Sequence, residues 1–355
     1  MSPFRRRIAR LLPLLLVSAL IALVVPTASA ATGLRIRPGQ SWDAVLQRAS
    51  AGSVVRVLAG VHPYQTLRGD YRGVRLVGVS RRDVIVRGVY LKQARNLTLR
   101  NFNTRPTASV PGIRVSYASE RLVIDDVTAV MRVGQAGFDI ARGDTTAPRN
   151  IRLSDIRYRG WRSSGVYARG LRIFAGSVPQ DQWPTGIVVE RADLRGAAAD
   201  LVQIGGGRNI TIRDSLLRGL QSNDEHNDGI QSYGSDNLRI VRTRISAPGD
   251  YEGPDQGIML SHGDNSHLRV TNTSVIDSTV VGFRGQGVSL AGTGSTVVRG
   301  NRVTEMSYPG SSLVLAGSNS DVVLEDNVLT RVYMVGDGTE FTSRSGNEIG
   351  STTSR

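Results

Sequence analysis

The chain has 355 residues, a formal charge of +14, 40 glycines and no cysteine, and only 5% of its residues are aromatic. The lack of cysteine excludes disulfide bonds, so a large and regular core must stabilise the fold. Many glycines and few aromatic residues are typical of a chain with numerous tight turns rather than of a helical protein.

The basic charge suits a polyanionic partner, such as an acidic polysaccharide or a nucleic acid. Only Lys92 is a lysine, however, and a genome-wide preference for arginine explains the charge equally well. The sequence contains no nucleic-acid-binding module and no arginine-rich tail, so we expect no nucleic-acid partner.

Residues 1–30 have the three parts of an export signal: the basic "MSPFRRRIAR", the apolar "LLPLLLVSALIALVV" and the small residues of "PTASA" before a cut after Ala30. The apolar run is short for a membrane span. We therefore expect a signal peptide, a secreted protein and no membrane span. The arginines at 5–7 leave general and twin-arginine export both open. Removal of this segment, which holds four arginines and no acid, lowers the charge to +10.

Residues 31–60 are predicted to form an N-terminal cap. Within them, "SWDAVLQRAS" (41–50) has the pattern of a short amphipathic helix with Ser41 as its N-cap, and the turn and strand "AGSVVRVLAGVHPY" follow. A cap is expected because a stack of strands exposes raw edges at each end.

One short unit, a turn residue followed by apolar-x-apolar, recurs along the rest of the chain. Its copies are spaced by 23–36 residues, and their first apolar residues are Leu97, Leu122, Ile151, Ile187, Ile210, Leu238, Leu268, Val297 and Val322. Between them runs a second series, which reads "GIRV", "GFDI", "GVYA", "LVQI", "GIQS", "GIML", "GVSL" and "SLVL".

Two or three short strands in every 23–36 residues are the signature of a parallel β-helix. A β-sandwich would need hairpin turns that the sequence lacks, and leucine-rich repeats would need a leucine pattern that is also missing. We predict an all-β solenoid of about eleven coils over residues 61–335, and a flexible tail over residues 336–355. We expect a monomer.

Alternate residues of a strand face opposite sides, so the second series predicts an outward row along the solenoid. The row consists of Arg114, Asp139, Tyr167, Gln203, Gln231, Met259, Ser289 and Val314. A polysaccharide lying along this row would touch several side chains, although a solenoid surface is polar in any case.

Three positions earlier lies a row that contains Ser164, Asp200, Asp228, Gln256 and Gln286. "DLVQI" and "DGIQS" share the pattern D-x-apolar-Q one coil apart, so their aspartates should be stacked. Two such carboxylates can divide the roles of acid and base in glycosidic bond chemistry. An Asp/Gln ladder that closes turns explains the same pattern, and so does a calcium site with Asp224, Glu225 and Asp255 in the neighbouring loops.

The helix and turns of residues 34–64, together with the repeats up to residue 335, resemble the pectate-lyase-like right-handed parallel β-helix superfamily. Three successive rungs, "HNDGIQ" (226–231), "DQGIML" (255–260) and "GQGVSL" (285–290), resemble the polygalacturonase signatures N-T-D-G-I-D, D-D-C-I-A and G-H-G-I-S. The resemblance implies a right-handed helix, water activation by Asp228 and a general acid at Asp255. Gln256 and Gln286 stand where that family has an aspartate and a histidine, so half of its machinery is absent.

We therefore predict a secreted carbohydrate-active protein that cleaves an acidic, uronate-containing polysaccharide by elimination or hydrolysis. The candidate catalytic residues are Asp228, His226, Asp200 and Asp255, where His226 serves as an auxiliary base or substrate ligand. The candidate substrate-binding residues are Gln203, Gln231, Tyr167, His262 and Arg284. Calcium is the one cofactor that the loop acids suggest. The alternative is a non-catalytic β-helix protein that binds glycan or forms a structural element at the cell surface.

Overall fold

The computed structural model describes residues 33–107, 110–132, 136–160, 168–219, 227–247, 256–262, 268–306, 310–336 and 338–354. Its internal contacts divide the chain at residue 32, and residues 33–355 form one compact unit. The predicted signal peptide lies outside the described residues. No helix among the described residues is long and apolar enough to cross a membrane.

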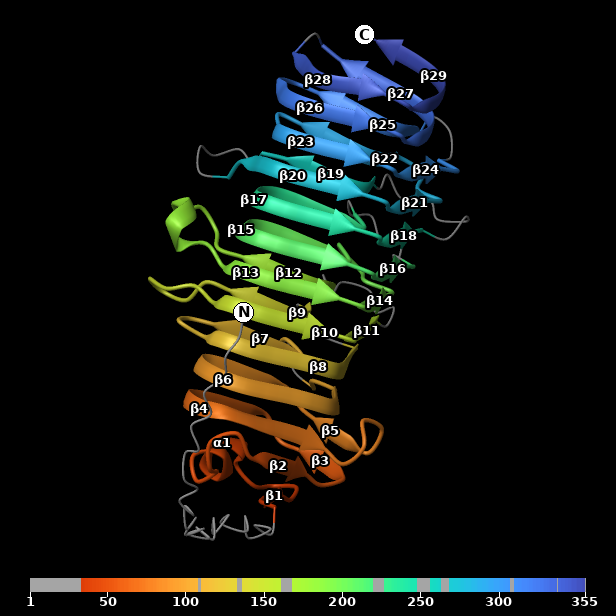
Figure 1. Ribbon diagram of the computed structural model, residues 1–355. Coiled ribbons are helices and arrows are strands. Elements are labelled where there is room, and N and C mark those ends of the chain that lie inside the picture. Colours follow the sequence, from red (N-terminus) through yellow and green to blue (C-terminus); the bar gives the residue numbers. More distant parts are fainter. Residues whose placement is uncertain are drawn as a thin grey trace, which may run out of the picture. The chain divides into compact units, whose positions relative to one another are not determined.

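The described residues form 29 strands, which are joined by parallel pairing into one continuous sheet. Each coil of the chain passes through three stacks of strands, here named A, B and C, and every strand pairs with the equivalent strand of the next coil (Figure 1). Several long strands bend and contribute to two stacks, and β6 contributes to all three. The all-β parallel β-helix is therefore confirmed.

Stack A contains β1 (Arg35–Ile36), β2 (Val54–Val57), part of β4 (Gln65–Gly78), of β6 (Val89–Thr104) and of β8 (Glu120–Met131), β10 (Arg149–Ser154), β13 (Thr185–Glu190), part of β15 (Val202–Arg213) and of β17 (Ile230–Val241), β20 (Val270–Ile276), β23 (Gly294–Arg299), β26 (Asn319–Glu325) and β28 (Thr339–Ser345). Stack B contains β3 (Gly60–His62), β5 (Val84–Val86), the ends of β6 and β8, β11 (Arg157–Gly160), β14 (Asp193–Arg195), β16 (Leu216–Arg218), β18 (Arg244–Ser246), β21 (Thr279–Val281), β24 (Arg302–Thr304) and the starts of β27 (Val328–Val335) and β29 (Glu348–Ser354).

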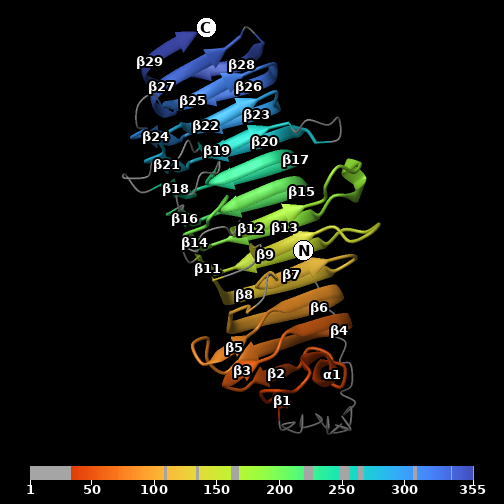
Figure 2. The same ribbon diagram turned by 180° about the vertical axis from the view of Figure 1, so that it is seen from behind.

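Stack C contains the starts of β4, β6, β15 and β17, the ends of β27 and β29, and β7 (Ile113–Ser116), β9 (Ala136–Ala141), β12 (Arg169–Phe174), β19 (Gln256–Ser261), β22 (Gln286–Ala291) and β25 (Ser311–Ala316). Seen from behind, β7, β9, β12, β19, β22 and β25 lie one above another (Figure 2).

The interior is a single apolar core made of inward residues from all three stacks. The predicted first series is in register from Leu97 to Leu238: each residue pairs with its equivalent one coil on, and all are buried. Burying one such aliphatic side chain stabilises the fold by about 1.5–3 kcal/mol, so the repeated apolar column fixes the stacking.

Two of the predicted inward positions are wrong. Leu268 precedes β20, and the inward residue of that coil is the buried Thr273; Val297 is an outward residue between the buried Thr296 and Val298. Thr296 is accepted inside because its hydroxyl bonds that of Thr293 at 3.0 Å. A threonine at an inward position has the shape of valine. Because it is polar, a search of the sequence for alternating apolar residues does not identify it as inward.

The helix α1 (Trp42–Leu46) lies at the N-terminal end of the described residues. Ser41 occupies its N-cap as predicted and accepts a hydrogen bond from the backbone of Ala44 at 3.3 Å. The helix is only five residues long, shorter than the expected segment. Trp42 is buried, and its indole lies 3.3 Å from Nδ1 of His62.

The expected tail requires a correction, because β28 and β29 add strands to the solenoid after residue 335. Their Gly/Ser/Thr-rich sequence lacks a strong hydrophobic pattern, but Phe341 and Ile349 pack against the core. Asn347 also closes the turn, since its Oδ1 accepts the backbone N–H of Asn327 at 3.1 Å. Asn301 and Asn327 repeat this arrangement one coil earlier at 3.0 Å.

Candidate functional site

The outer face of stack C carries a continuous row of side chains, most of them polar or aromatic. In register, it runs through Tyr90, Arg114, Asp139, Arg172, Gln203, Gln231, Met259, Ser289 and Val314. Neighbouring strands are about 4.8 Å apart, so the row has one side chain per coil, of which those of Asp139, Gln231, Ser289 and Val314 are buried. We call these nine residues the stack C row. It contains every residue of the predicted row except Tyr167.

Tyr167 lies outside the described residues, and Arg172 occupies the place in the row that was predicted for it. The strand of this coil is β12, in which Leu171 and Ile173 point inward and are fully buried. The sequence offers two neighbouring alternations, "GVYA" (165–168) and "GLRIF" (170–174). The second one is the strand because its apolar pair continues the core column from β9 to β15.

Asp139 and Arg172 form a buried ion pair in the row. Arg172 donates to both carboxylate oxygens of Asp139, at 2.8 and 3.1 Å, and Nε of Arg114 lies 3.6 Å away on the other side. Asp139 is only 1% exposed, so these two guanidinium groups are what makes its charge tolerable there. The sequence places Asp139 in the row, but its partner becomes visible only with the true register.

Aromatic side chains accompany the arginines at the N-terminal coils. The guanidinium group of Arg114 lies 5.5 Å from the ring centre of Tyr90, and that of Arg172 lies 5.4 Å from the ring of Phe174. Tyr64 and Phe174 are 39% and 40% exposed. Burial raises the pKa of Tyr64, whereas the charge of Arg114 opposes that shift. This part of the face therefore combines flat rings with fixed hydrogen-bond donors.

Asp200 and Asp228 are stacked on adjacent coils, as predicted. Asp200 accepts the backbone N–H of Asp228 at 3.1 Å, and Asp228 accepts the backbone N–H of Gln256 at 3.0 Å. The two aspartates are 2% and 0% exposed. Each carboxylate therefore fixes the start of the next coil, which is the arrangement of the predicted Asp/Gln ladder.

The aspartates also connect to the stack C row. Gln231 donates from Nε2 to the other carboxylate oxygen of Asp228 at 3.0 Å, and Gln203 donates to Oε1 of Gln231 at 3.2 Å. Nε of Arg169 lies 3.7 Å from Asp200. The predicted substrate-binding glutamines are therefore brought together with the predicted catalytic aspartates.

The predicted residues His226, Asp255, Asp224 and Glu225 lie outside the described residues. The auxiliary base, the general acid and the calcium site thus remain predictions. Within the described parts of the chain, no group of three or more His, Asp or Glu side chains is placed to hold a metal ion.

His262 and Arg284 lie at opposite ends of stack C. His262 follows β19, where its ring packs over Gly292 and Nδ1 lies 3.2 Å from the carbonyl oxygen of Ala291. Six residues of extended chain, about 20 Å at ~3.3 Å each, separate this position from the aspartate end of the strands. His262 therefore occupies the turn that follows β19 rather than the edge that holds the stacked aspartates. Arg284 is exposed and precedes β22 on the aspartate side.

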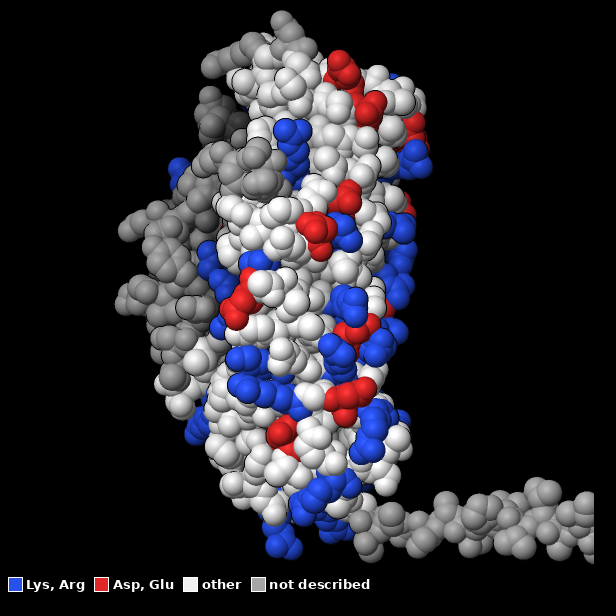
Figure 3. All heavy atoms as spheres, turned by 90° about the vertical axis from the view of Figure 1, so that its left-hand side faces the viewer, with Lys and Arg blue, Asp and Glu red and all other residues white. Residues whose placement is uncertain are grey.

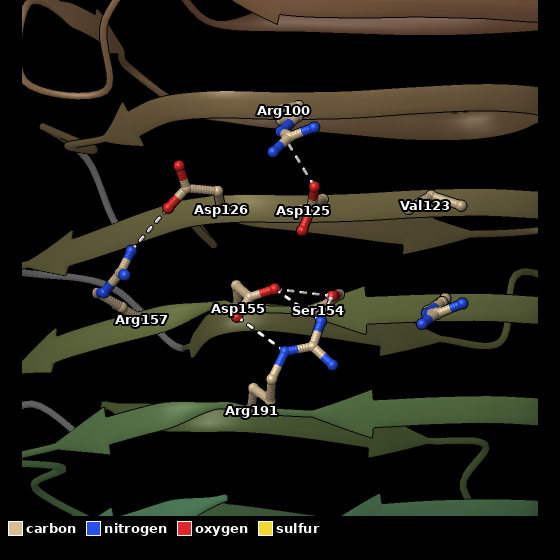
Figure 4. Close-up of a pocket in the computed structure, with 9 residues that line it drawn as sticks. Arg100, Val123, Asp125, Asp126, Ser154, Asp155, Arg157 and Arg191 are labelled. Atoms are coloured by element: carbon tan, nitrogen blue, oxygen red, sulfur yellow. Dashed lines mark hydrogen bonds and ion pairs between the residues drawn. The ribbon is translucent and has the colours of Figure 1, made fainter. Parts of the chain in front are cut away.

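A pocket of about 520 Å³ lies on the other side of the coil, where stack A turns into stack B (Figure 4). Its charged residues pair with one another: Arg100 with Asp125 at 3.1 Å, Arg157 with Asp126 at 2.8 Å and Arg191 with Asp155 at 2.7 Å. Hydrogen bonds from Arg191 hold the pKa of Asp155 below its usual range.

Glu190, beside this pocket, is fully buried. Burial, the largest influence, raises its pKa, but hydrogen bonds from Arg152 and Arg213 outweigh burial and leave the pKa lowered. Figure 3 likewise shows acidic and basic side chains next to each other along the side that it presents. The pocket is thus an ion-pair network whose guanidinium groups are already neutralised, and sequence reasoning did not identify it.

The sequence model of a family described as "Right handed beta helix region" matches residues 150–353. No curated protein sequence matches the chain. Among solved structures, PfbA, a surface adhesin of Streptococcus pneumoniae, is 10% identical with a TM-score of 0.67, and the match covers 90% of this chain and 91% of PfbA.

Two further structures share the fold. The Dettilon tailspike protein is 13% identical with a TM-score of 0.63, and 85% of this chain matches 62% of the tailspike, so this chain spans less than two thirds of that protein. The Agl-KA catalytic domain is 10% identical with a TM-score of 0.53, over 91% of this chain and 69% of that domain. At these identities the similarity shows the fold alone.

Proposed function

From the premise that the chain belongs to the right-handed β-helix family, we propose that it is an exported, monomeric protein that binds an acidic polysaccharide along the outer face of stack C. One observation carries the proposal. The stack C row places the half-buried Tyr90, Arg114, Arg172 and Gln203 on one face, with the buried Asp139 between the arginines and the buried Gln231 on the coil after Gln203.

The chemistry of the row suits a sugar chain. Tyrosine and phenylalanine rings present apolar faces with a polar tip nearby, and amide groups of glutamine both donate and accept hydrogen bonds to hydroxyl groups. Arginine binds carboxylates through two parallel hydrogen bonds. The charge of +10 left after the predicted cleavage attracts a polyanion from a distance.

The fold is compatible with this role but does not select it. A surface adhesin and a catalytic domain, both distant in sequence, have the same architecture. The choice between binding and cleavage therefore depends on the residues of this chain.

Cleavage is the second candidate function. It is favoured by Asp200 and Asp228, two buried carboxylates one coil apart, of which Asp228 accepts a hydrogen bond from Gln231 of the row. In that role Asp228 would be the main acid/base, with His226 and Asp255 as predicted from the sequence. The ladder of backbone hydrogen bonds gives both aspartates a structural task as well, so binding is the function that the geometry supports best.

The test measures binding of polygalacturonate, alginate and a neutral glucan by isothermal titration calorimetry, together with mass spectrometry of any products. We expect Gln203→Ala to weaken binding of an acidic chain, whereas Thr211→Ala, on the stack A face of the same strand, should not. Loss of binding in both variants, or binding of no glycan by the wild type, would contradict the proposal. Products lighter by one water would establish a lyase, and hydrated products a hydrolase.

A further inference from the structure

A second cavity, of about 450 Å³, lies at the corner where stack B turns into stack C. It is lined by Arg87, Arg105, Pro106, Thr107, Val130 and Arg132. The three arginines follow the ends of β5, β6 and β8, so they come from successive coils. We call this cavity the arginine pocket.

The composition of the arginine pocket is opposite to that of the pocket in Figure 4. There, each of three arginines has an aspartate partner within 3.1 Å. Among the described residues that line the arginine pocket, none is acidic. Arg87 and Arg105, with no carboxylate among the described lining residues, create a positive potential in a partly enclosed space.

The backbone of the pocket is well fixed. The N–H of Arg105 donates to the carbonyl oxygen of Val86 at 2.8 Å, and the N–H of Arg87 donates to that of His62 at 3.1 Å. Nη1 of Arg87 also donates to the carbonyl oxygen of Arg105 at 3.3 Å. The half-buried Arg87 is therefore held in place, while Arg105 is exposed and can close on a ligand.

The arginine pocket is close to the stack C row along the chain. Arg87 precedes Tyr90 by three residues in the same coil, and Gly88 stands between them at the corner. A Cβ atom on Gly88 would come within 2.9 Å of the ring of Tyr64, and its φ of +135° also requires glycine. The exposed Tyr64 thus lies against the same corner that leads from the pocket to the row.

We propose that the arginine pocket binds the carboxylate or sulfate group of an acidic sugar residue. The guanidinium forks match the paired oxygens of such a group, and Pro106 and Val130 offer an apolar wall to the sugar ring. A cavity of this size is within the range that takes a small ligand. The inference rests on the proposed function and deepens it, because it assigns the preference for acidic glycans to these residues.

The test uses the double variant Arg87→Gln/Arg105→Gln and the control Arg75→Gln/Arg95→Gln, which removes the same charge at exposed positions outside the pocket. Calorimetry measures binding of a galacturonate oligomer and of its neutral methyl ester. Because a hydrogen bond to a charged group is worth about 1.5–3 kcal/mol, we expect the pocket variant to bind the acidic oligomer roughly ten- to a hundredfold more weakly. Binding of the methyl ester, and the affinity of the control, should be unchanged.

Equal weakening in the control, or unchanged affinity in the pocket variant, would overturn the assignment. Circular dichroism melting curves show whether each variant folds. If the wild type binds neither oligomer, the proposed function fails, and inorganic sulfate then tests the pocket by itself. Saturable sulfate binding that is lost in the pocket variant supports an anion site, whereas absence of sulfate binding refutes it.

Discussion

Substitutions of Asp228 separate its structural role from a catalytic one. Its carboxylate accepts hydrogen bonds from the backbone of Gln256 at 3.0 Å and from Nε2 of Gln231 at 3.0 Å. Asparagine keeps the first acceptor but places an amide NH₂ group opposite the donor of Gln231. Gln231 can correct this by rotating its amide. The half-buried Gln203, which donates to Oε1 of Gln231, can then rotate in turn.

The two substitutions should therefore differ in their cost. Asp228→Ala loses two hydrogen bonds to a charged acceptor and leaves the N–H of Gln256 without its partner, a loss of about 4 kcal/mol at ~2 kcal/mol for each bond. Asp228→Asn should cost about 1 kcal/mol after the amides rotate. With an unfolding entropy of ~2.1 cal/mol/K per residue over roughly 320 residues, these values lower Tm by about 6 °C and about 1.5 °C.

The assay is thermal unfolding followed by both circular dichroism and tryptophan fluorescence, because a solenoid need not unfold in one step. Equal destabilisation by Asp228→Asn and Asp228→Ala would refute the expectation that the amides of Gln231 and Gln203 rotate to accommodate asparagine. Glycan binding retained in Asp228→Asn with loss of all cleavage would instead establish Asp228 as a catalytic acid/base. If both binding and any cleavage are retained, the carboxylate serves only the ladder.

Three other predictions follow from the same structure. Asn327→Ala should destabilise the C-terminal coils by about 3–4 kcal/mol at ~1 kcal/mol per hydrogen bond, because its buried amide bonds Asn301, Val298 and Asn347; chemical denaturation shows this, and an unchanged midpoint would contradict it. Since the pKa of Glu190 is lowered in the fold, its contribution to stability is present above the unfolded pKa of about 4.3 and is lost as the pH falls further; Tm should drop more steeply with acid in the wild type than in Glu190→Gln, and parallel curves would disprove this. If residues 1–30 are an export signal, intact-mass measurement of the secreted protein should find Ala31 at its N-terminus, and an uncleaved chain would rule that out.

The fold was predictable because its information is periodic. Buried apolar pairs recur in every coil, so an error in one coil leaves the others in register, and residues such as Leu122 and Ile210 are placed correctly from the sequence. The sequence predictions fail where the alternation of apolar residues is weak, or where two neighbouring segments of one coil both show it. Thr273 and Thr296 are inward although they are polar, and β28 and β29 are strands in spite of their small residues.

The site was predictable only in part, because it depends on pairing between coils. The sequence shows that Asp200 and Asp228 occupy equivalent positions, and their stacking is confirmed. It does not show whether a carboxylate in such a position faces a ligand or the backbone of the next coil, because the direction of a side chain is set by the turn. Arg172 was missed for a related reason: a five-residue shift in the choice of strand exchanges the side chain presented to the row.

The stack C row changes character along its length, and this change limits where an acidic glycan can bind. From Tyr90 to Gln231 every member is aromatic, charged or an amide, whereas the row continues with Met259, Ser289 and Val314. Since the arginine pocket opens beside the first coils of the same row, both features favour the N-terminal half. An acidic chain would therefore be held by charge near Arg87 and by the amide of the half-buried Gln203, next to the buried Gln231 and the two stacked aspartates, which serve as structural supports or as catalysts.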